Sequence, residues 1–151
     1  MGKTVYILSC TSTKDKDART VEKLYTGPLF KKGLNYARRQ KPDAILVIGG
    51  VCKSEVFRLD DDCSYYDGIK LKKLSISERK KLAQKRLDKI LAHGFSAEDD
   101  TFVFLTGQDY YEFILAGRKN ALPGALQHYE TPFPDNHLRG YGDIYRYLDN
   151  N

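Results

Sequence analysis

The residue types best suited to chemistry gather in one short stretch near the N-terminus. An apolar run, Val5–Leu8, leads directly into Ser9-Cys10-Thr11-Ser12-Thr13-Lys14. Hydroxyl groups and one ammonium group at the end of a buried strand can bind an anion together with backbone N–H groups. A thiol near cations and N–H dipoles can also serve as a nucleophile. We therefore expect Cys10 and Lys14 to be catalytic, and the ligand to be bound by Ser9, Thr11 and Thr13.

Two further apolar segments end in small or polar residues. The first, 44–48, ends at Gly49-Gly50 with Lys53 shortly after, and the second, 101–106, is followed by Gly107, Gln108 and Tyr110. Glycines let the backbone approach another group closely. A second cation, an amide and a phenol at these positions would suit a phosphate, a ribose or a base edge. We expect all of these residues to bind the ligand.

Two tyrosines lie in segments that a simple turn or cap explains less fully. Tyr25 precedes Thr26-Gly27-Pro28-Leu29-Phe30, and Tyr66 is followed by Asp67 in a long irregular connection. A hydroxyl beside a carboxylate can transfer protons. Asp67 is therefore predicted to be catalytic, and Tyr66 to bind the ligand. Tyr25, which capping and packing explain less fully, is also a predicted catalytic residue.

Each of these segments also has an ordinary structural explanation. The N-terminal stretch fits a polar turn after a strand, with Cys10 as a small buried residue. Lys53 fits a solvated loop lysine, and Tyr66-Asp67 fits a turn leading into Gly68. Convergence of the loops is the argument that favours a site over separate turns, and it depends on the fold.

The order of apolar patterns predicts a single α/β domain. The sequence predicts strands at 3–9, 44–48 and 101–106, helices from Pro28 to Lys41, from Ser75 to His93, over 110–117 and over 141–148, and a loop over 127–141. Such alternation is typical of a mostly parallel sheet flanked by helices. The carboxyl ends of parallel strands lie at one edge, where ligands bind. We expect one domain over 1–151, with a core at about 3–117, a closing segment at 118–151 and a ligand cleft at that edge.

Composition and motifs exclude several classes of protein. The chain has 151 residues, of which 41% are hydrophobic and 30% charged, and it contains no apolar run long enough to span a membrane. The cysteines and histidines, three of each, show no zinc or disulfide spacing. Neither GxxxxGK[ST] nor GxGxxG is present, which disfavours P-loop NTPases and dinucleotide-binding enzymes. We expect a cytoplasmic protein with no metal, no cofactor and no membrane partner.

The net charge of +5 is concentrated in one block. The cations of residues 70–89 include Lys73, Arg79, Lys80 and Arg86. This block fits either the solvated face of a surface helix or a surface that binds nucleic acid. A non-catalytic DNA- or RNA-binding protein is therefore an alternative to an enzyme.

Several of these motifs resemble a known group of proteins. Residues 7–14 read ILSCTSTK and residues 24–32 read LYTGPLFKK, with Tyr66-Asp67 and Ser77-Glu78-Arg79 further on. They resemble an uncharacterised family of small bacterial and phage domains that is similar to the peroxide-stress protein YaaA and to the core domain of archaeosine synthase. Cys10 and Lys14 match the Cys-xxx-Lys of the synthase motif, and Tyr25 matches its tyrosine. Gly27 stands where the small-domain family usually has serine.

The resemblance covers roughly residues 4–117 and implies work on nucleic acid or on a modified base. The expected function is therefore a nucleobase- or nucleotide-directed enzyme, in nucleic-acid modification or repair, with a nucleobase, a nucleotide or nucleic acid as its partner. A third alternative is a nucleoside N-glycosidic-bond enzyme, because residues 24–30 resemble the Gly-Pro-Phe start of nucleoside deoxyribosyltransferases. The substrate, the reaction and the oligomeric state stay open.

Overall fold

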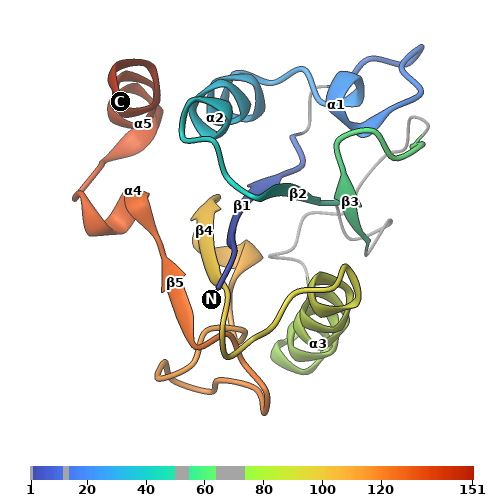
Figure 1. Cartoon of the computed structure of the whole chain (residues 1–151), viewed down its shortest axis with the longest axis vertical. Helices are drawn as coiled ribbons and strands as arrows, with labels where there is room; N and C mark the ends of the chain where they lie inside the picture. Colours follow the sequence, from blue (N-terminus) through green and yellow to red (C-terminus); the bar gives the residue numbers. More distant parts are fainter. Residues whose placement is uncertain (1, 12–13, 50–54, 64–73) are drawn as a thin grey trace.

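The computed structural model describes residues 2–11, 14–49, 55–63 and 74–151 (Figure 1). The described residues form a five-stranded sheet in the order β3-β2-β1-β4-β5. The strands are β1 (Thr4–Ser9), β2 (Ala44–Ile48), β3 (Val56–Arg58), β4 (Thr101–Leu105) and β5 (His128–Glu130). Strands β2, β1, β4 and β5 run parallel, and β3 is antiparallel to β2. The predicted α/β fold with a mostly parallel sheet is confirmed.

One face of the sheet is covered by α2 (Pro28–Arg39) and α5 (Gly140–Asn150), which lie side by side (Figure 1). Leu8, Val47 and Val103 point to this face and share a buried cluster with Leu34 and Ala37 of α2. Two short helices, α1 (Val21–Leu24) and α4 (Pro132–Asp135), add buried residues to the same cluster. Pro28 occupies the first turn of α2, where its missing N–H costs no hydrogen bond.

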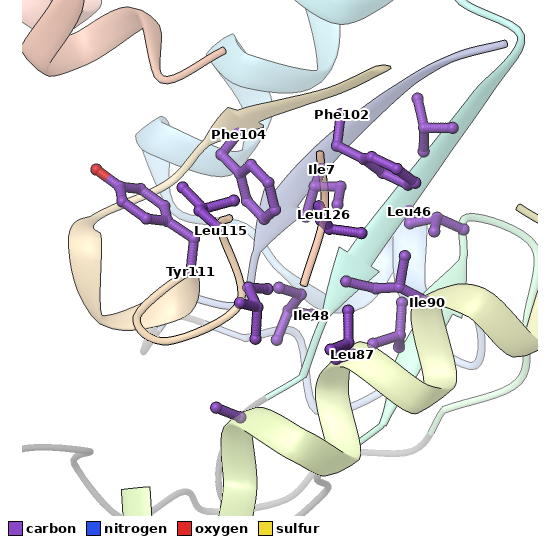
Figure 2. Packing of buried hydrophobic residues seen from close by; sticks show 14 of the residues in the cluster. Ile7, Leu46, Ile48, Leu87, Ile90, Phe102, Phe104, Tyr111, Leu115 and Leu126 are labelled. Atoms are coloured by element: carbon purple, nitrogen blue, oxygen red, sulfur yellow. The ribbon is translucent and has the colours of Figure 1, made fainter. Parts of the chain in front are cut away.

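The opposite face is covered by α3 (Ile76–Ala92). Figure 2 shows Ile7, Leu46 and Ile48 of the sheet packed against Leu87 and Ile90 of the helix. Since alternate residues of β1 enter the two clusters, the strand is buried on both faces, and its apolar run is continuous for that reason.

The helix predicted from Ser75 is confirmed as α3, and it begins with a capping box. The Glu78 N–H donates to Ser75 Oγ at 3.1 Å, and the Ser75 N–H donates to Glu78 Oε1 at 3.3 Å. At the other end, Gly94 adopts φ +97°, a left-handed conformation that glycine takes at little cost. Among the described residues, no helix is both long and apolar enough to cross a membrane.

The prediction of a helix over 110–117 is wrong. Only the short 3-10 helix η3 (Gln108–Tyr110) forms there. Phe113 and Gly117 both have positive φ, and Leu115 makes a parallel bridge with Leu126. The apolar residues of this segment enter the core from an irregular chain, so their spacing reflects burial and not helical periodicity.

The loop predicted over 127–141 is also wrong in part. It contains β5, which pairs with β4, and α4. Both elements are very short, with three and four residues, so neither leaves a periodic pattern in the sequence. The closing helix predicted over 141–148 is confirmed as α5.

Asp100 ties the start of β1 to the loop before β4. Its carboxylate is 6% exposed and accepts hydrogen bonds from the backbone N–H groups of Lys3 at 2.6 Å and Ser96 at 2.7 Å. Burial by itself raises the pKa of Asp100, but these bonds and the charge of Lys3 outweigh burial and lower that pKa below its ordinary value.

We expect Asp100→Asn to lower the free energy of unfolding by about 1–3 kcal/mol at pH 7, because an amide cannot accept both bonds. A lowered native pKa stabilises the fold above the unfolded pKa of about 4, and this stabilisation is lost as the pH falls through the native pKa. The gap between wild type and variant in urea unfolding should therefore shrink from pH 6 to pH 2. A gap that is constant over this range would contradict the assignment, and exposed Asp88→Asn is the control.

Candidate functional site at the carboxyl edge of the sheet

The sheet has a topological switch point between β1 and β4. The connection from β1 to β2 passes through α2 on one face, whereas the connection that returns to β4 passes through α3 on the other. Loops at such a point turn away from each other and leave a crevice at the carboxyl edge. The residues that follow β1 and β4 lie at this edge, and these are Cys10 and Thr11 on one side and Thr106 to Tyr110 on the other.

Cys10 and Tyr110 meet across this edge. Cys10 Sγ lies 3.2 Å from Tyr110 Oη, within hydrogen-bond distance for a sulfur atom, and either group can donate. The Cys10 N–H donates to Ile48 O at 2.9 Å, so the strand pairing of β1 extends to this residue. Both side chains are half-buried. Two positions one hundred residues apart thus form a thiol–phenol pair at the predicted edge.

A buried arginine lies on the other side of the Tyr110 ring. Arg86 of α3 is 3% exposed, and its guanidinium carbon is 5.2 Å from the centroid of the ring. Its Nη2 approaches the carbonyl oxygen of Gly49, at the end of β2, at 3.5 Å. A cation over an aromatic face is attracted by the ring quadrupole. The side chain therefore places a positive charge beside the Tyr110 ring, whose hydroxyl contacts the Cys10 thiol, and close to the end of β2.

Sequence reasoning assigned Arg86 to a solvated basic block and missed its position. The signal was present, because Arg86 falls on the apolar stripe of Leu82, Ala83, Leu87 and Ile90. An arginine on the buried stripe of a helix lies under the sheet and not in solvent. That spacing could have identified it.

Thr11 and Gly27 bring the loop after β1 against the start of α2. The Gly27 N–H donates to Thr11 Oγ1 at 3.3 Å. A Cβ at position 27 would lie 2.8 Å from the Thr11 Cβ, so the close approach requires glycine.

Lys14 and Tyr25 are also brought together. They form an antiparallel bridge, and the Tyr25 ring is fully buried 5.5 Å from the ring of Phe30. Packing at the base of α2 therefore accounts for Tyr25. Its burial leaves Lys14, which is half-buried, as the more accessible member of this pair.

The remaining predicted residues divide into three groups. Ser9 and Gly49 are buried at the ends of β1 and β2, and Gly107 and Gln108 are exposed after β4. Five predicted residues lie outside the described part of the chain, and these are Thr13, Gly50, Lys53, Tyr66 and Asp67. The contacts thus join Cys10 to Tyr110 directly, and join Gly49 to that pair through Arg86.

A groove of about 460 Å³ lies elsewhere, along β3 and the end of α3. Glu55, Asp61, Asp62, Lys89 and His93 supply its polar lining. Lys89 Nζ is 2.6 Å from Glu55 Oε1, and a ring nitrogen of His93 is 2.7 Å from the carbonyl oxygen of Val56. These contacts hold β3 to α3. Within the described ranges, no cluster of histidine, cysteine and carboxylate side chains could hold a metal ion.

Most cations of α3 contact the protein itself. Arg79 lies 3.7 Å from Glu112, Lys80 lies 5.7 Å from the centroid of the Phe113 ring, and Lys89 pairs with Glu55. The exposed cations of this helix are Lys81 and Lys85. Lys70, Lys72 and Lys73 of the predicted basic block lie outside the described residues. The helix therefore presents less free positive charge than its sequence implies.

Comparison with known proteins identifies a family and no function. A family model described as a family of unknown function, DUF6884, matches residues 5–135. The match begins in β1 and ends in α4, so it includes the thiol–phenol pair and Arg86. No curated protein and no solved structure matches the chain.

Tyr110→Phe removes the hydroxyl that contacts Cys10. Because this hydroxyl lies within hydrogen-bond distance of the sulfur, we expect alkylation of Cys10 by iodoacetamide at pH 7 to slow about tenfold in this variant, or about 1.4 kcal/mol. Peptide mass spectrometry would follow Cys10 alone. Tyr129→Phe is the control, because its hydroxyl donates to Ala116 O, away from the thiol. Equal rates in wild type and Tyr110→Phe would show that the contact does not influence the thiol.

Proposed function

We propose that this chain, which belongs to the family of unknown function DUF6884, is an enzyme that acts on a nucleobase or a nucleotide, free or within a nucleic acid. The observation that carries the proposal is the 3.2 Å contact between Cys10 and Tyr110 at the switch point of the sheet. Ligands of open α/β sheets bind at such a point. The pair combines a nucleophile with a proton donor there.

The chemistry assigned to the pair is covalent. The Cys10 thiolate attacks an electron-poor carbon of the bound ring, and Tyr110 delivers a proton to the atom on which charge develops. The buried Arg86 guanidinium lies 5.2 Å from the Tyr110 ring and adds a positive charge beside the pair. Lys14 neutralises a phosphate or another anionic group of the ligand.

Two arguments favour a nucleobase over other rings. The matching Cys10 and Lys14 resemble the Cys-xxx-Lys of archaeosine synthase, and the surrounding motifs resemble YaaA-like proteins. Gln108 is exposed and lies two residues before Tyr110. Its amide can form hydrogen bonds with a base edge or a ribose. Lys53, Tyr66 and Asp67 lie outside the described residues and stay predicted site residues. A reduced Cys10 fits the reducing conditions of the cytoplasm, where we place the protein.

The alternative of a non-catalytic protein that binds DNA or RNA through α3 stays a prediction. Among the described residues, its surface would depend on Lys81 and Lys85, because Arg86 is buried and Arg79 and Lys89 are near carboxylates. The nucleoside N-glycosidic-bond enzyme also stays a prediction. Release of free base from a panel of nucleosides would support it, and absence of release would remove it.

Ligand binding raises the melting temperature of the native state, so a thermal-shift screen can find the ligand class. We expect a nucleobase or nucleotide to raise the melting temperature by several degrees at about 100-fold excess over its Kd, equivalent to about 2.7 kcal/mol. Lys14→Ala and Cys10→Ser should each reduce that shift. Lys81→Ala, on exposed α3, should leave it unchanged.

The opposite pattern would contradict the proposal. If nucleic acid alone raises the melting temperature, and the shift survives Lys14→Ala but falls in Lys81→Ala or at high salt, the binding surface is α3 and not the strand edge.

A further inference from the structure

The first half of α5 presents two aromatic rings at the surface. Tyr141 is 63% exposed, which makes it, with Ile76, one of two large exposed hydrophobic residues in the described chain. Its ring stacks on that of Tyr145, with centroids 5.8 Å apart and planes 27° from parallel. The pair is one helical turn apart, so both rings lie on the same side of α5. One flat face of the stack is therefore available to a planar ligand.

One cation lies beside this stack, and two others are close to it in the sequence. Lys32 Nζ of α2 lies 5.8 Å from the centroid of the Tyr145 ring, and the side chain of Arg146 is 72% exposed. Arg139, directly before α5, is also exposed. The nearby carboxylates already have cationic partners, since Asp143 pairs with Arg146 and Asp149 with Lys32. These two ion pairs balance, and Arg139 adds one positive charge that pairs with neither carboxylate. Aromatic rings beside cations suit bases on a phosphate backbone, whose phosphates would compete with Asp149 and Asp143 for Lys32 and Arg146.

The direction of α5 places this surface toward the edge that carries the proposed site. Gly27, at the start of α2, contacts Thr11 beyond the end of β1, so α2 begins at the carboxyl edge. Helix α5 runs parallel to α2, because Lys32 lies near Tyr145 while Gln40, after the end of α2, bonds to Asn151. The first residues of α5 therefore point toward the carboxyl edge of the sheet.

We propose that Tyr141 and Tyr145, with Lys32 and Arg146, form a stacking surface for single-stranded nucleic acid. Bases stack on the open face of the tyrosine pair, and the cations contact the adjacent phosphates. The strand then continues toward the edge where Cys10 and Tyr110 lie. This last step rests on the proposed function and narrows its substrate to a base within a single strand. The stacking surface on α5 is a nucleic-acid contact separate from the one predicted on α3.

The test measures binding of a fluorescent twelve-nucleotide oligo(dT) by anisotropy. We expect Tyr141→Ala to weaken binding about tenfold, whereas Tyr141→Phe, which keeps the ring, should bind within about twofold of wild type. Ile76→Ala is the matched control, because it removes the other exposed hydrophobic side chain, on α3, and should have no effect. Because Tyr141 is exposed, Tyr141→Ala should stay folded, so unfolding should not account for a loss of binding. Circular dichroism would check that the variant is folded.

Charge variants separate the two helices. Arg146→Gln should reduce the slope of log Kd against log salt by about 0.7, the value for one phosphate contact on a single strand, and Lys81→Gln on α3 should leave the slope unchanged. The reverse result, a slope that depends on Lys81 and not on Arg146, would overturn the inference in favour of α3. Equal binding by wild type and Tyr141→Ala would also overturn it, as would a wild-type protein that binds no single strand.

The outcomes distinguish this inference from the proposed function. If a mononucleotide raises the melting temperature but oligo(dT) does not bind, the proposed site at the strand edge is supported and the stacking surface is rejected. A protein that binds oligo(dT) through Tyr141, but shows no mononucleotide shift, would keep the stacking surface and lose the enzyme. If Tyr141 and Tyr145 bind another protein and not oligo(dT), the proposal that this surface binds nucleic acid is overturned.

Discussion

β1 pairs with parallel neighbours on both sides and is buried on both faces, and this constraint positions everything else. β2 lies on one side of β1 and β4 on the other. Because crossovers between parallel strands are right-handed, α2 and α3 cover opposite faces of the sheet. The loops after β1 and β4 then separate at the carboxyl edge. Cys10 directly follows β1 and Tyr110 lies in η3 after β4, so both residues are at this edge, where their side chains are in contact.

The second determinant is the burial of Arg86. A guanidinium loses solvation inside a protein, and this loss must be offset by close polar or aromatic neighbours. Here the neighbours include the Tyr110 ring and the Gly49 carbonyl oxygen. The same residue therefore links α3, the end of β2 and η3. Its placement makes α3 part of the candidate site and removes one cation from the surface of that helix.

The long periodic elements could be predicted from the sequence, and the short or irregular ones could not. β2 and the capping box of α3 follow from continuous apolar residues and from Ser75 with Glu78. β5 depends on pairing with β4, which no local pattern records, and residues 110–117 are held by tertiary burial. The convergence of Cys10 and Tyr110 followed from the parallel sheet alone. The burial of Arg86 was not predicted, because arginine is usually exposed and its charge was given more weight than its position on the apolar stripe of α3.

The most direct test of the switch-point site is protection of Cys10 from alkylation. The protein would be treated with iodoacetamide, with and without a nucleotide that raises its melting temperature, and the modified cysteines would be identified by mass spectrometry. A ligand between Cys10 and the loop after β4 should slow alkylation of Cys10 at least tenfold. An unchanged rate at Cys10 with the ligand bound would place the ligand elsewhere and contradict the account.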